Sequence, residues 1–292
     1  GWGTVELWVA GSRLDRVGED RIRTDWVRGL WHDDAARLLR VGPESRLPID
    51  GRGGLVYEPT GGEFDEVRHF LVGLVDGAAV FTTDAPTLDE PTAIGRFAVN
   101  HLDDTERDVA ITALALVNWH RVAPHCGVCG GLTIVRQAGH VRYCPACDRD
   151  RFPRTDPAII TAILDDADRL LLAHNTAWDV PRMSLVAGFV DAGESLEACV
   201  RREALEEVGV RLAEVRYVAS QPWPFPRSLM LGFVARAEAS DVTVDGIEID
   251  RAVFVTRDEY DAMLADGRLA MPTSVSIAAS LIGLWRRGEL SV

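Results

Sequence analysis

Three glutamates, Glu203, Glu206 and Glu207, stand at positions i, i+3 and i+4. On an α-helix these positions share one face. Carboxylates held so close together repel one another, so the arrangement costs stability unless a cation sits among them. Carboxylate oxygens suit Mg²⁺ or Mn²⁺, and protein Mg²⁺ sites often combine carboxylates with substrate phosphates. The alternative is a solvated acidic helix face, which is the usual meaning of neighbouring glutamates.

The residues around these glutamates predict a helix between Ser195 and Gly209. Serine favours the N-cap position of a helix, and glycine favours the position just past its C-terminus. Apolar residues recur at every fourth position beside the acidic face: Leu196, Val200, Ala204 and Val208. Gly188 and Gly193 precede the helix, where they allow the backbone to bend or to approach a ligand closely.

Four of the five cysteines form two close pairs, Cys126-x2-Cys129 and Cys144-x2-Cys147, separated by a hairpin-length segment. This spacing predicts a tetrahedral Cys₄ zinc site, with hairpin strands over 132–135 and 140–143. Because all four ligands are thiolates, no position remains open for water, and the zinc is expected to be structural. Two disulfides or a redox pair are the alternatives, and disulfides are disfavoured without a secretory signal. The fifth cysteine, Cys199, is expected in the core.

A proline-rich segment reads Ser-Gln-Pro-Trp-Pro-Phe-Pro-Arg-Ser from position 220. Prolines at alternate positions are incompatible with a helix or a central strand, so a stiff extended loop is expected. Such a loop holds Trp223 and Phe225 with little entropy left to lose, which favours stacking on a flat base. Arg227 can pair with phosphate, and Gln221 and Ser228 can form hydrogen bonds. A rigid surface turn whose aromatic rings pack inward fits these residues equally well.

The chain has 292 residues and a formal net charge of −14. This charge excludes a general basic footprint for nucleic acid, although a local metal ion and a few arginines can still bind phosphates. Apolar residues make up 47% of the chain, which is enough to fill real cores. No stretch of 18 uninterrupted apolar residues occurs, and no charged-then-apolar leader opens the sequence. We therefore expect a soluble, cytoplasmic protein with no membrane partner.

The pattern along the chain predicts three parts: an N-terminal α+β domain (1–121), a Cys₄ zinc ribbon (122–156) and an α/β domain (157–292). In the first part, Asp76-Gly77 between two apolar runs predicts a hairpin. A helix is expected over 108–121, with a buried side made of Val109, Thr112, Ala113, Leu116 and Trp119. In the last part, residues 183–190 are expected to lead into the loop before the acidic helix, and strands are expected over 158–164, 169–174, 214–221, 228–237 and 252–255. The first two of these are expected to pair as a hairpin, and helices are expected over 258–265 and 276–287.

The acidic helix and the loop before it resemble the Nudix box, Gly-x5-Glu-x7-Arg-Glu-U-x-Glu-Glu-x-Gly-U, in which U is a bulky apolar residue. The matching residues are Gly188, Glu194, Arg202, Glu203, Glu206, Glu207 and Gly209. The proline-rich segment is similar to the Ser-Gln-Pro-Trp-Pro-Phe-Pro-x-Ser signature of the NADH pyrophosphatase subfamily, whose members also carry a Cys₄ zinc ribbon. The resemblance spans residues 126–230 and implies a Nudix α/β/α sandwich preceded by the ribbon and an N-terminal α+β domain.

The resemblance also implies roles at the acidic site. Glu203 and Glu207 resemble ligands of a catalytic Mg²⁺ or Mn²⁺, and Glu207 also resembles the essential carboxylate. Glu206 is similar to the box glutamate that assists metal or base chemistry. The carbonyl of Ala187 resembles a further metal ligand. Glu248 falls where the family places a distant acidic ligand, and Asp245 and Asp250 are the alternatives for that place.

For the substrate, the resemblance implies stacking on Phe189 and a backbone contact at Ala270. Phe152 stands where relatives often have a tyrosine, so it keeps a stacking face but lacks the hydroxyl. The expected substrate-binding residues are Phe152, Phe189, Gln221, Pro222, Trp223, Pro224, Phe225, Pro226, Arg227, Ser228 and Ala270.

The resemblance implies hydrolysis of NADH or NAD⁺ to nicotinamide mononucleotide and AMP, and removal of NAD caps from RNA 5′ ends. It also implies a homodimer in which both subunits contribute to each site, with one structural zinc per subunit. One alternative is a Nudix hydrolase of ADP-ribose or other nucleoside diphosphate derivatives. Another is a non-catalytic zinc-ribbon module that binds RNA through a modest basic patch: Arg142, Arg149, Arg151 and Arg154.

Overall fold

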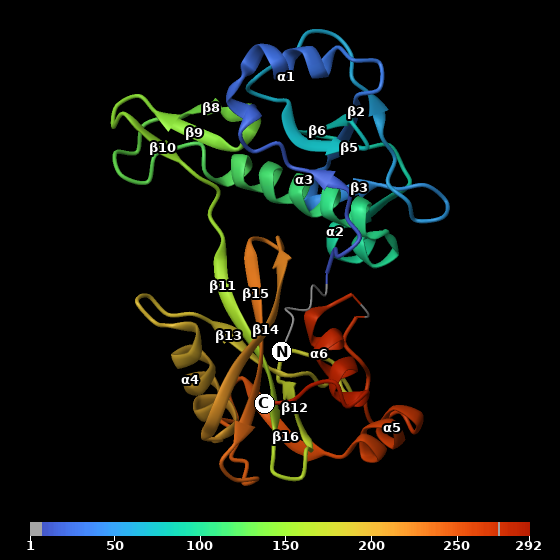
Figure 1. Cartoon of the computed structure of the whole chain (residues 1–292), viewed down its shortest axis with the longest axis vertical. Helices are drawn as coiled ribbons and strands as arrows, with labels where there is room; N and C mark the ends of the chain where they lie inside the picture. The colour runs from blue at the N-terminus through green and yellow to red at the C-terminus, as the bar shows by residue number, and fades with distance from the viewer. Residues whose placement is uncertain (1–7, 274) are drawn as a thin grey trace. The chain divides into compact units, whose positions relative to one another are not determined.

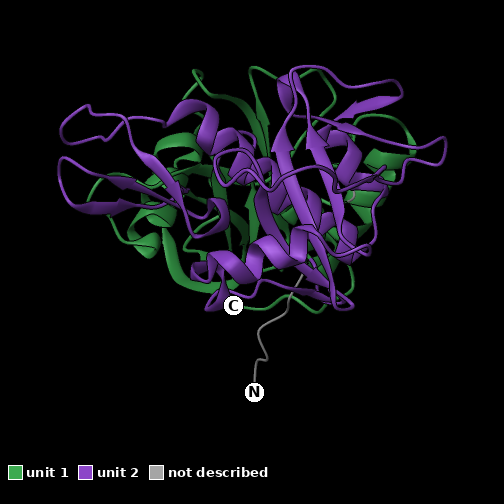
Figure 2. Cartoon of the chain, turned by 90° about the horizontal axis from the view of Figure 1, so that it is seen from above, with its two compact units in different colours: residues 1–8, 156–223, 228–292 green, residues 9–155, 224–227 purple. Residues whose placement is uncertain are grey.

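The computed structural model describes residues 8–273 and 275–292 (Figure 1). The chain forms two compact units, which Figure 2 draws in different colours. The N-terminal unit holds residues 9–155 and 224–227, and the C-terminal unit holds Trp8, 156–223 and 228–292. Among the described residues, no helix is both long enough and apolar enough to cross a membrane.

A five-stranded sheet forms the base of the N-terminal unit, with the strand order β1-β5-β6-β2-β4. β2 and β6 are parallel, and the other neighbours are antiparallel. The strands are β1 (Leu14–Asp15), β2 (Arg37–Val41), β4 (Glu58–Pro59), β5 (Phe70–Val75) and β6 (Ala78–Asp84). β5 and β6 turn through Asp76 and Gly77, both at positive φ, so the predicted hairpin is confirmed.

The same unit contains the helices α1 (Thr24–Trp31), α2 (Gly95–Ala98) and α3 (Asp104–Val122), the short 3₁₀ turns η1 (Asp20–Ile22), η2 (Pro43–Ser45) and η3 (Val99–His101), and the strand pair β3 (Arg46–Pro48) and β7 (Thr92–Ile94). α3 begins four residues before its predicted start, because the Asp103 carboxylate accepts the backbone N–H of Glu106 at 2.8 Å and caps the helix. All five residues of its predicted inner side are buried.

The cysteine-rich segment follows α3 as a three-stranded sheet of β8 (Ile134–Arg136), β9 (Val141–Cys144) and β10 (Arg149–Arg151), with the turn η4 (Gln137–Gly139) between the first two. Two histidines tie it to the rest of the N-terminal unit. The Nε2 of His140 lies 2.7 Å from the carbonyl oxygen of Leu71, and that of His120 lies 2.7 Å from the carbonyl oxygen of Gly139. Gly139 has a φ of 96° and packs against Phe70 so closely that no side chain would fit.

The C-terminal unit contains a six-stranded mixed sheet with the order β14-β15-β11-β12-β16, and β13 pairs with β11. Its strands are β11 (Asp156–Leu164), β12 (Leu170–Asn175), β13 (Val186–Phe189), β14 (Leu212–Trp223), β15 (Ser228–Ala237) and β16 (Ile249–Val255). The helices are α4 (Leu196–Val208), α5 (Arg257–Ala265) and α6 (Ile277–Arg286).

Alternate residues of β11 enter two separate cores, which is why helices cover both faces of the sheet. Ile159 and Ile163 pack in a cluster with Val200 and Ala204 of α4. Ile160, Ala162 and Leu164 pack in the other cluster, to which α5 and α6 contribute Tyr260, Leu281 and Trp285 among others. The expected α/β/α sandwich is therefore confirmed.

The expected hairpin of the first two strands is confirmed, because β11 and β12 pair as antiparallel neighbours. Their pairing is short, with Leu164 opposite Leu170, because β11 otherwise pairs with β13 and β15 while β12 pairs with β16 along its length. One sequence-based expectation about this sheet was wrong, because the proline-rich segment is not a free loop. β14 continues through Pro222 to Trp223, and a short turn leads to Ser228 at the start of β15. An edge strand tolerates proline because one of its sides needs no ladder hydrogen bonds, and β14 is such a strand.

Candidate active site and zinc centre

The acidic helix α4 begins and ends as its sequence predicts. The Ser195 hydroxyl oxygen accepts the backbone N–H of Ala198 at 3.2 Å, and Gly209 ends the helix in the left-handed region at φ 68°. Val200, Ala204 and Val208 are fully buried under the sheet. This packing fixes the rotation of the helix and therefore the direction of its acidic face.

The three glutamates of that face have unequal surroundings. Glu203 and Glu207 are buried, at 9% and 5% exposure, whereas Glu206 is exposed. Burial raises the pKa of Glu203, and it raises that of Glu207 to about 8 with help from the charges of Glu203, Glu248 and Asp245. Among the described residues, no basic side chain forms an ion pair with Glu207. This pair of buried acids therefore fits a divalent cation, which would offset their desolvation and repulsion.

The acidic site does not offer a complete set of protein ligands to a metal ion. Among the described residues, only the four cysteines bring three or more potential ligand atoms within 4.8 Å of one another. The carboxylates of α4 do not converge in this way, so water and substrate oxygens would have to complete the coordination of a cation held there. That arrangement is typical of Mg²⁺ sites that act on phosphates.

Arg202 connects the preceding loop to the acidic face. Its guanidinium donates to both oxygens of Glu194, at 2.7 and 3.0 Å, and also to Glu203 at 2.8 Å and Glu206 at 3.1 Å. A further N–H reaches the carbonyl oxygen of Phe189 at 3.1 Å. The pairing with Arg202 lowers the pKa of Glu194 to about 2. The sequence placed Arg202 and Glu194 in the box pattern, but this organising role was not predicted.

Gly188 allows the strand before the helix to approach Glu203. A Cβ atom at position 188 would lie 2.2 Å from the Cδ atom of Glu203, so any larger residue would displace the carboxylate. The backbone of Ala187 and Gly188 in β13 therefore lies against one of the two buried acids. The expected role of the Ala187 carbonyl as a metal ligand is compatible with this placement and stays a prediction.

The distant acid has three candidates, and they differ in what else they bind. One carboxylate oxygen of Asp245 accepts three backbone N–H groups, at 2.9 to 3.1 Å. The carboxylate of Asp250 lies 2.7 Å from Nδ1 of His174. The exposed Glu248 side chain makes no hydrogen bond with a described residue, and its charge raises the pKa of both Glu203 and Glu207. The role of Glu248 as the distant metal ligand stays a prediction.

The residues expected to bind substrate fall into two groups. Phe189 and Phe152 are 60% and 67% exposed, and Ala270 is exposed as well. Both rings therefore have free faces.

The second group is the proline-rich segment, in which Gln221 is buried. The Gln221 amide donates to the carbonyl of Val275 at 2.7 Å and accepts the N–H of Ile277 at 3.0 Å, so it holds the start of α6. Pro224 is buried and Pro226 is exposed, and the remaining members are half-buried: Pro222, Trp223, Phe225, Arg227 and Ser228. Their contacts with substrate stay predictions.

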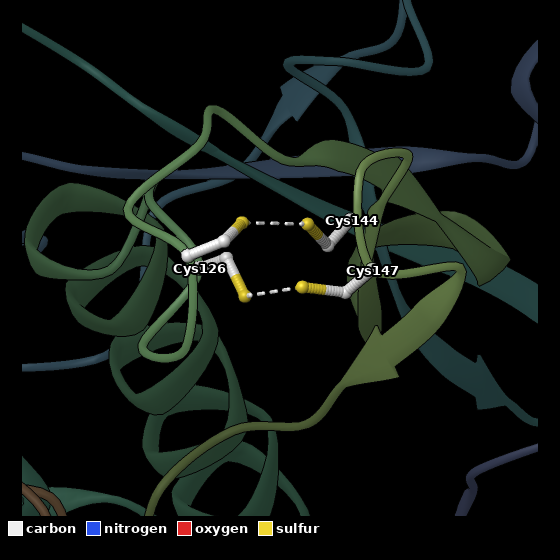
Figure 3. Close-up of side chains that lie close together, drawn as sticks. Cys126, Cys144 and Cys147 are labelled. Carbon is white, nitrogen blue, oxygen red and sulfur yellow. Dashed lines mark hydrogen bonds between the residues drawn. The ribbon is translucent and has the colours of Figure 1, made fainter.

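The four cysteines have the geometry of a zinc site (Figure 3). The Sγ atoms of Cys126 and Cys147 are 3.9 Å apart, and those of Cys129 and Cys144 are 3.5 Å apart. Sulfurs about 2.3 Å from a tetrahedral zinc are about 3.8 Å from one another, whereas a disulfide needs about 2.05 Å. Backbone N–H groups, with Arg151 at 3.0 Å, lower the pKa of the Cys126 thiol to about 5. The predicted Cys₄ site therefore fits a structural zinc, and the fifth cysteine, Cys199, is buried as expected.

The proposed basic patch near the ribbon is not confirmed as a surface. Arg142 is only 8% exposed, and its guanidinium donates to the hydroxyl and carbonyl oxygens of Thr133, at 2.7 and 3.1 Å, and to Nδ1 of His120 at 2.9 Å. Arg151 donates to the Cys126 sulfur. Two of the four arginines thus bind groups of the ribbon, and Arg142 also binds His120 of α3.

Comparison with known proteins agrees with this arrangement. The NUDIX domain model matches residues 154–273, and the NADH pyrophosphatase zinc ribbon domain model matches residues 121–152. The chain is 38% identical over 297 residues to the NAD-capped RNA hydrolase NudC of Mycobacterium bovis, covering 94% of this chain and 95% of that protein. The Mycobacterium tuberculosis protein of the same name is 37% identical over the same shares. Human NAD-capped RNA hydrolase NUDT12 is 34% identical over 202 residues, 65% of this chain and 44% of that protein. The chain therefore belongs to the Nudix hydrolases with an NADH pyrophosphatase zinc ribbon.

Proposed function

We propose that this protein hydrolyses the pyrophosphate bond of NADH and NAD⁺, and removes NAD caps from RNA 5′ ends. The observation that carries the proposal is the pair of buried acids on α4, Glu203 and Glu207, with the charge of Glu248 acting on both. An anionic dinucleotide could enter such an acidic site only together with cations. The names of the relatives, which cover almost the whole chain, support NAD-capped RNA as a substrate.

The reaction is the attack of water on one phosphorus of the bridge. When bound, Mg²⁺ or Mn²⁺ neutralises phosphate oxygens and lowers the pKa of the water that it holds. Glu203, Glu207, Glu248 and the Ala187 carbonyl would be its protein ligands, and Glu207 or Glu206 would accept the proton of the attacking water. Arg202 holds the acidic face in place through its bonds to Glu194 and Glu203.

The remaining expected residues act on the ends of the substrate. The exposed faces of Phe189 and Phe152 offer stacking surfaces for the nicotinamide or adenine ring. Arg227 would pair with phosphate, and the backbone at Ala270 would contact the base. We also propose a homodimer, which equilibrium sedimentation of the purified protein would reveal.

The test is a substrate panel. The full-length protein is incubated with NADH, NAD⁺, NAD-capped RNA and ADP-ribose, in Mg²⁺ or Mn²⁺, and the products are identified by mass spectrometry. We expect AMP and nicotinamide mononucleotide from NAD⁺, AMP and the reduced mononucleotide from NADH, and 5′-monophosphate RNA and nicotinamide mononucleotide from the capped RNA. Fast cleavage of ADP-ribose with none of NADH or capped RNA would overturn the proposal. So would cleavage that persists after every divalent ion has been removed.

A further inference from the structure

The loop that carries Glu248 is fixed by its own aspartate. Oδ1 of Asp245 accepts the backbone N–H groups of Ile247, Glu248 and Ile249 at 3.0, 3.1 and 2.9 Å. The N–H of Gly246 donates to the carbonyl of Ile249 at 2.9 Å and closes the same turn. We call residues 245–249 the Glu248 loop. One carboxylate oxygen therefore determines the backbone conformation on both sides of Glu248.

A threonine holds the same loop from β12. The N–H of Thr176, which directly follows β12, donates to the carbonyl of Glu248 at 2.9 Å. Its hydroxyl donates to the carbonyl of Ile247, also at 2.9 Å. Thr176 therefore binds the carbonyl groups of both Ile247 and Glu248, which lie on either side of the Glu248 Cα atom. Thr176 lies outside the box and the proline-rich segment, so neither motif pointed to it.

The loop is also joined directly to the acidic helix. The N–H of Asp245 donates to the carbonyl oxygen of Glu207 at 3.1 Å, and the N–H of Thr243 donates to that of Val208 at 2.9 Å. Gly209 makes this approach possible, because a Cβ atom there would lie 3.0 Å from Thr243. The backbone of Asp245 is therefore hydrogen-bonded to that of Glu207, one of the two α4 acids on which the charge of Glu248 acts.

These bonds oppose the repulsion among the acids of the site. Glu203, Glu207 and Glu248 repel one another, and Glu248 stands in an exposed loop that could relieve the repulsion by moving away. If the loop is already fixed, binding of a cation loses less free energy to the ordering of Glu248. Residues that orient metal ligands through hydrogen bonds commonly change metal affinity by about 10- to 100-fold.

We propose that Asp245 and Thr176 are positioning residues that hold the Glu248 carboxylate against the α4 acids and thereby set the affinity of the site for Mg²⁺ or Mn²⁺. The proposal rests on the proposed function in one respect, namely that Glu248 is the distant acidic ligand. Asp245 acts here through its hydrogen bonds and not as a ligand.

The first experiment measures Mn²⁺ binding to full-length variants by electron paramagnetic resonance, in the absence of substrate. Asp245→Ala should weaken Mn²⁺ binding by about tenfold or more, and Thr176→Val by less, since the backbone N–H remains. Asp245→Asn and Thr176→Ser should restore most of the affinity, because they keep the acceptor oxygen and the donor hydroxyl. The control is Asp266→Ala. Asp266 caps its own loop after α5 by accepting the N–H of Arg268 at 3.1 Å, and its loss should leave Mn²⁺ affinity unchanged.

The second experiment is a double-mutant cycle. If Asp245 acts through Glu248, then Asp245→Ala should cause little further loss of Mn²⁺ affinity in a Glu248→Gln background. Additive losses, or an unchanged affinity in Glu248→Gln alone, would overturn the proposal. Failure of the proposed function looks different. A wild-type protein that binds Mn²⁺ in this Asp245-dependent way but does not cleave NADH would refute the substrate and leave the positioning role standing.

Discussion

The zinc centre and the acidic site both bring metal ligands together, but only the zinc centre has a full set of protein ligands close to one another. All four cysteine sulfurs lie within 4.8 Å of one another, and N–H groups already donate to two of them, those of Cys126 and Cys129. The α4 carboxylates are buried and mutually repulsive, and burial with neighbouring charges raises the pKa of Glu207 to about 8. The zinc centre already holds all four ligands that its ion needs, whereas the acidic site needs cations and substrate oxygens to offset the repulsion of its carboxylates.

This difference separates a structural role from a catalytic one. A closed tetrahedral site has no room for substrate and gives its binding energy to folding. An open acidic site is costly in the empty protein, and that cost is offset only when the reactants are bound. Substitutions at the two centres should therefore have opposite effects on stability and activity.

The largest effect is expected at the zinc centre. Cys144→Ser removes a fully buried ligand and should abolish zinc binding, which supplies about 10 kcal/mol or more in small zinc domains. We expect loss of zinc by mass spectrometry and a strongly lowered unfolding temperature. Cys199→Ser is the matched control, because this buried cysteine lies on α4 and should leave the zinc content unchanged. Full stability without zinc in Cys144→Ser would contradict a structural role.

Glu207→Gln should have the reverse effect at the acidic site. It removes a carboxyl that is charged in the metal-free protein only near or above its pKa of about 8. At such pH values the metal-free protein should therefore unfold at the same or a higher temperature, while kcat falls by about a thousandfold. NADH hydrolysis and thermal unfolding measure the two quantities. Glu197→Gln, in the first turn of the same helix, is the control and should keep normal turnover. Near-normal activity in Glu207→Gln would show that Glu207 is not needed for catalysis.

Acid should destabilise the N-terminal unit through two histidines. Burial lowers the pKa of His120 and of His140 from 6.5 to about 4. Since the unfolded chain then binds protons more readily than the folded one, stability should fall as the pH drops from about 6.5 toward 4. The full loss is about 3 kcal/mol for each histidine. His140→Gln can still donate to the Leu71 carbonyl and does not titrate, so urea unfolding should show a smaller acid loss for it.

The acidic site should respond to pH with the opposite sign. In the metal-free protein, the pKa of Glu207 is raised from 4.5 to about 8 by burial and by its acidic neighbours. The folded state then holds the proton more tightly, and its contribution to stability rises as the pH falls from about 8 to 4.5. Glu207→Gln should remove this dependence and leave the histidine effect intact. The same slope in both proteins would show that Glu207 does not titrate in this range.

The sequence predicted what depends on local spacing and missed what depends on distant partners. The ends of α4 and the zinc ligands follow from residues a few positions apart. The burial of Arg142 could not be predicted, because one of its partners, His120, lies 22 residues away on α3. The bonds of the Gln221 amide could not be predicted either, because its partners are backbone groups 54 and 56 residues further along the chain. The prolines at 222 and 224 suggested a loop because nothing local marks β14 as an edge strand.

The smallest expected effect tests how tightly the acidic site is fixed. Gly188→Ala would place a Cβ atom 2.2 Å from the Cδ atom of Glu203, so the carboxylate or β13 must move. We expect a loss of roughly 1–3 kcal/mol in stability, as for other overpacked positions, together with weaker Mn²⁺ binding. Gly29→Ala is the control, because α1 leaves open space at that position and alanine favours a helix. Unchanged Mn²⁺ affinity in Gly188→Ala would mean that Glu203 can move without loss. The acidic site would then be flexible as well as open, and its ligands would be ordered by the cation itself.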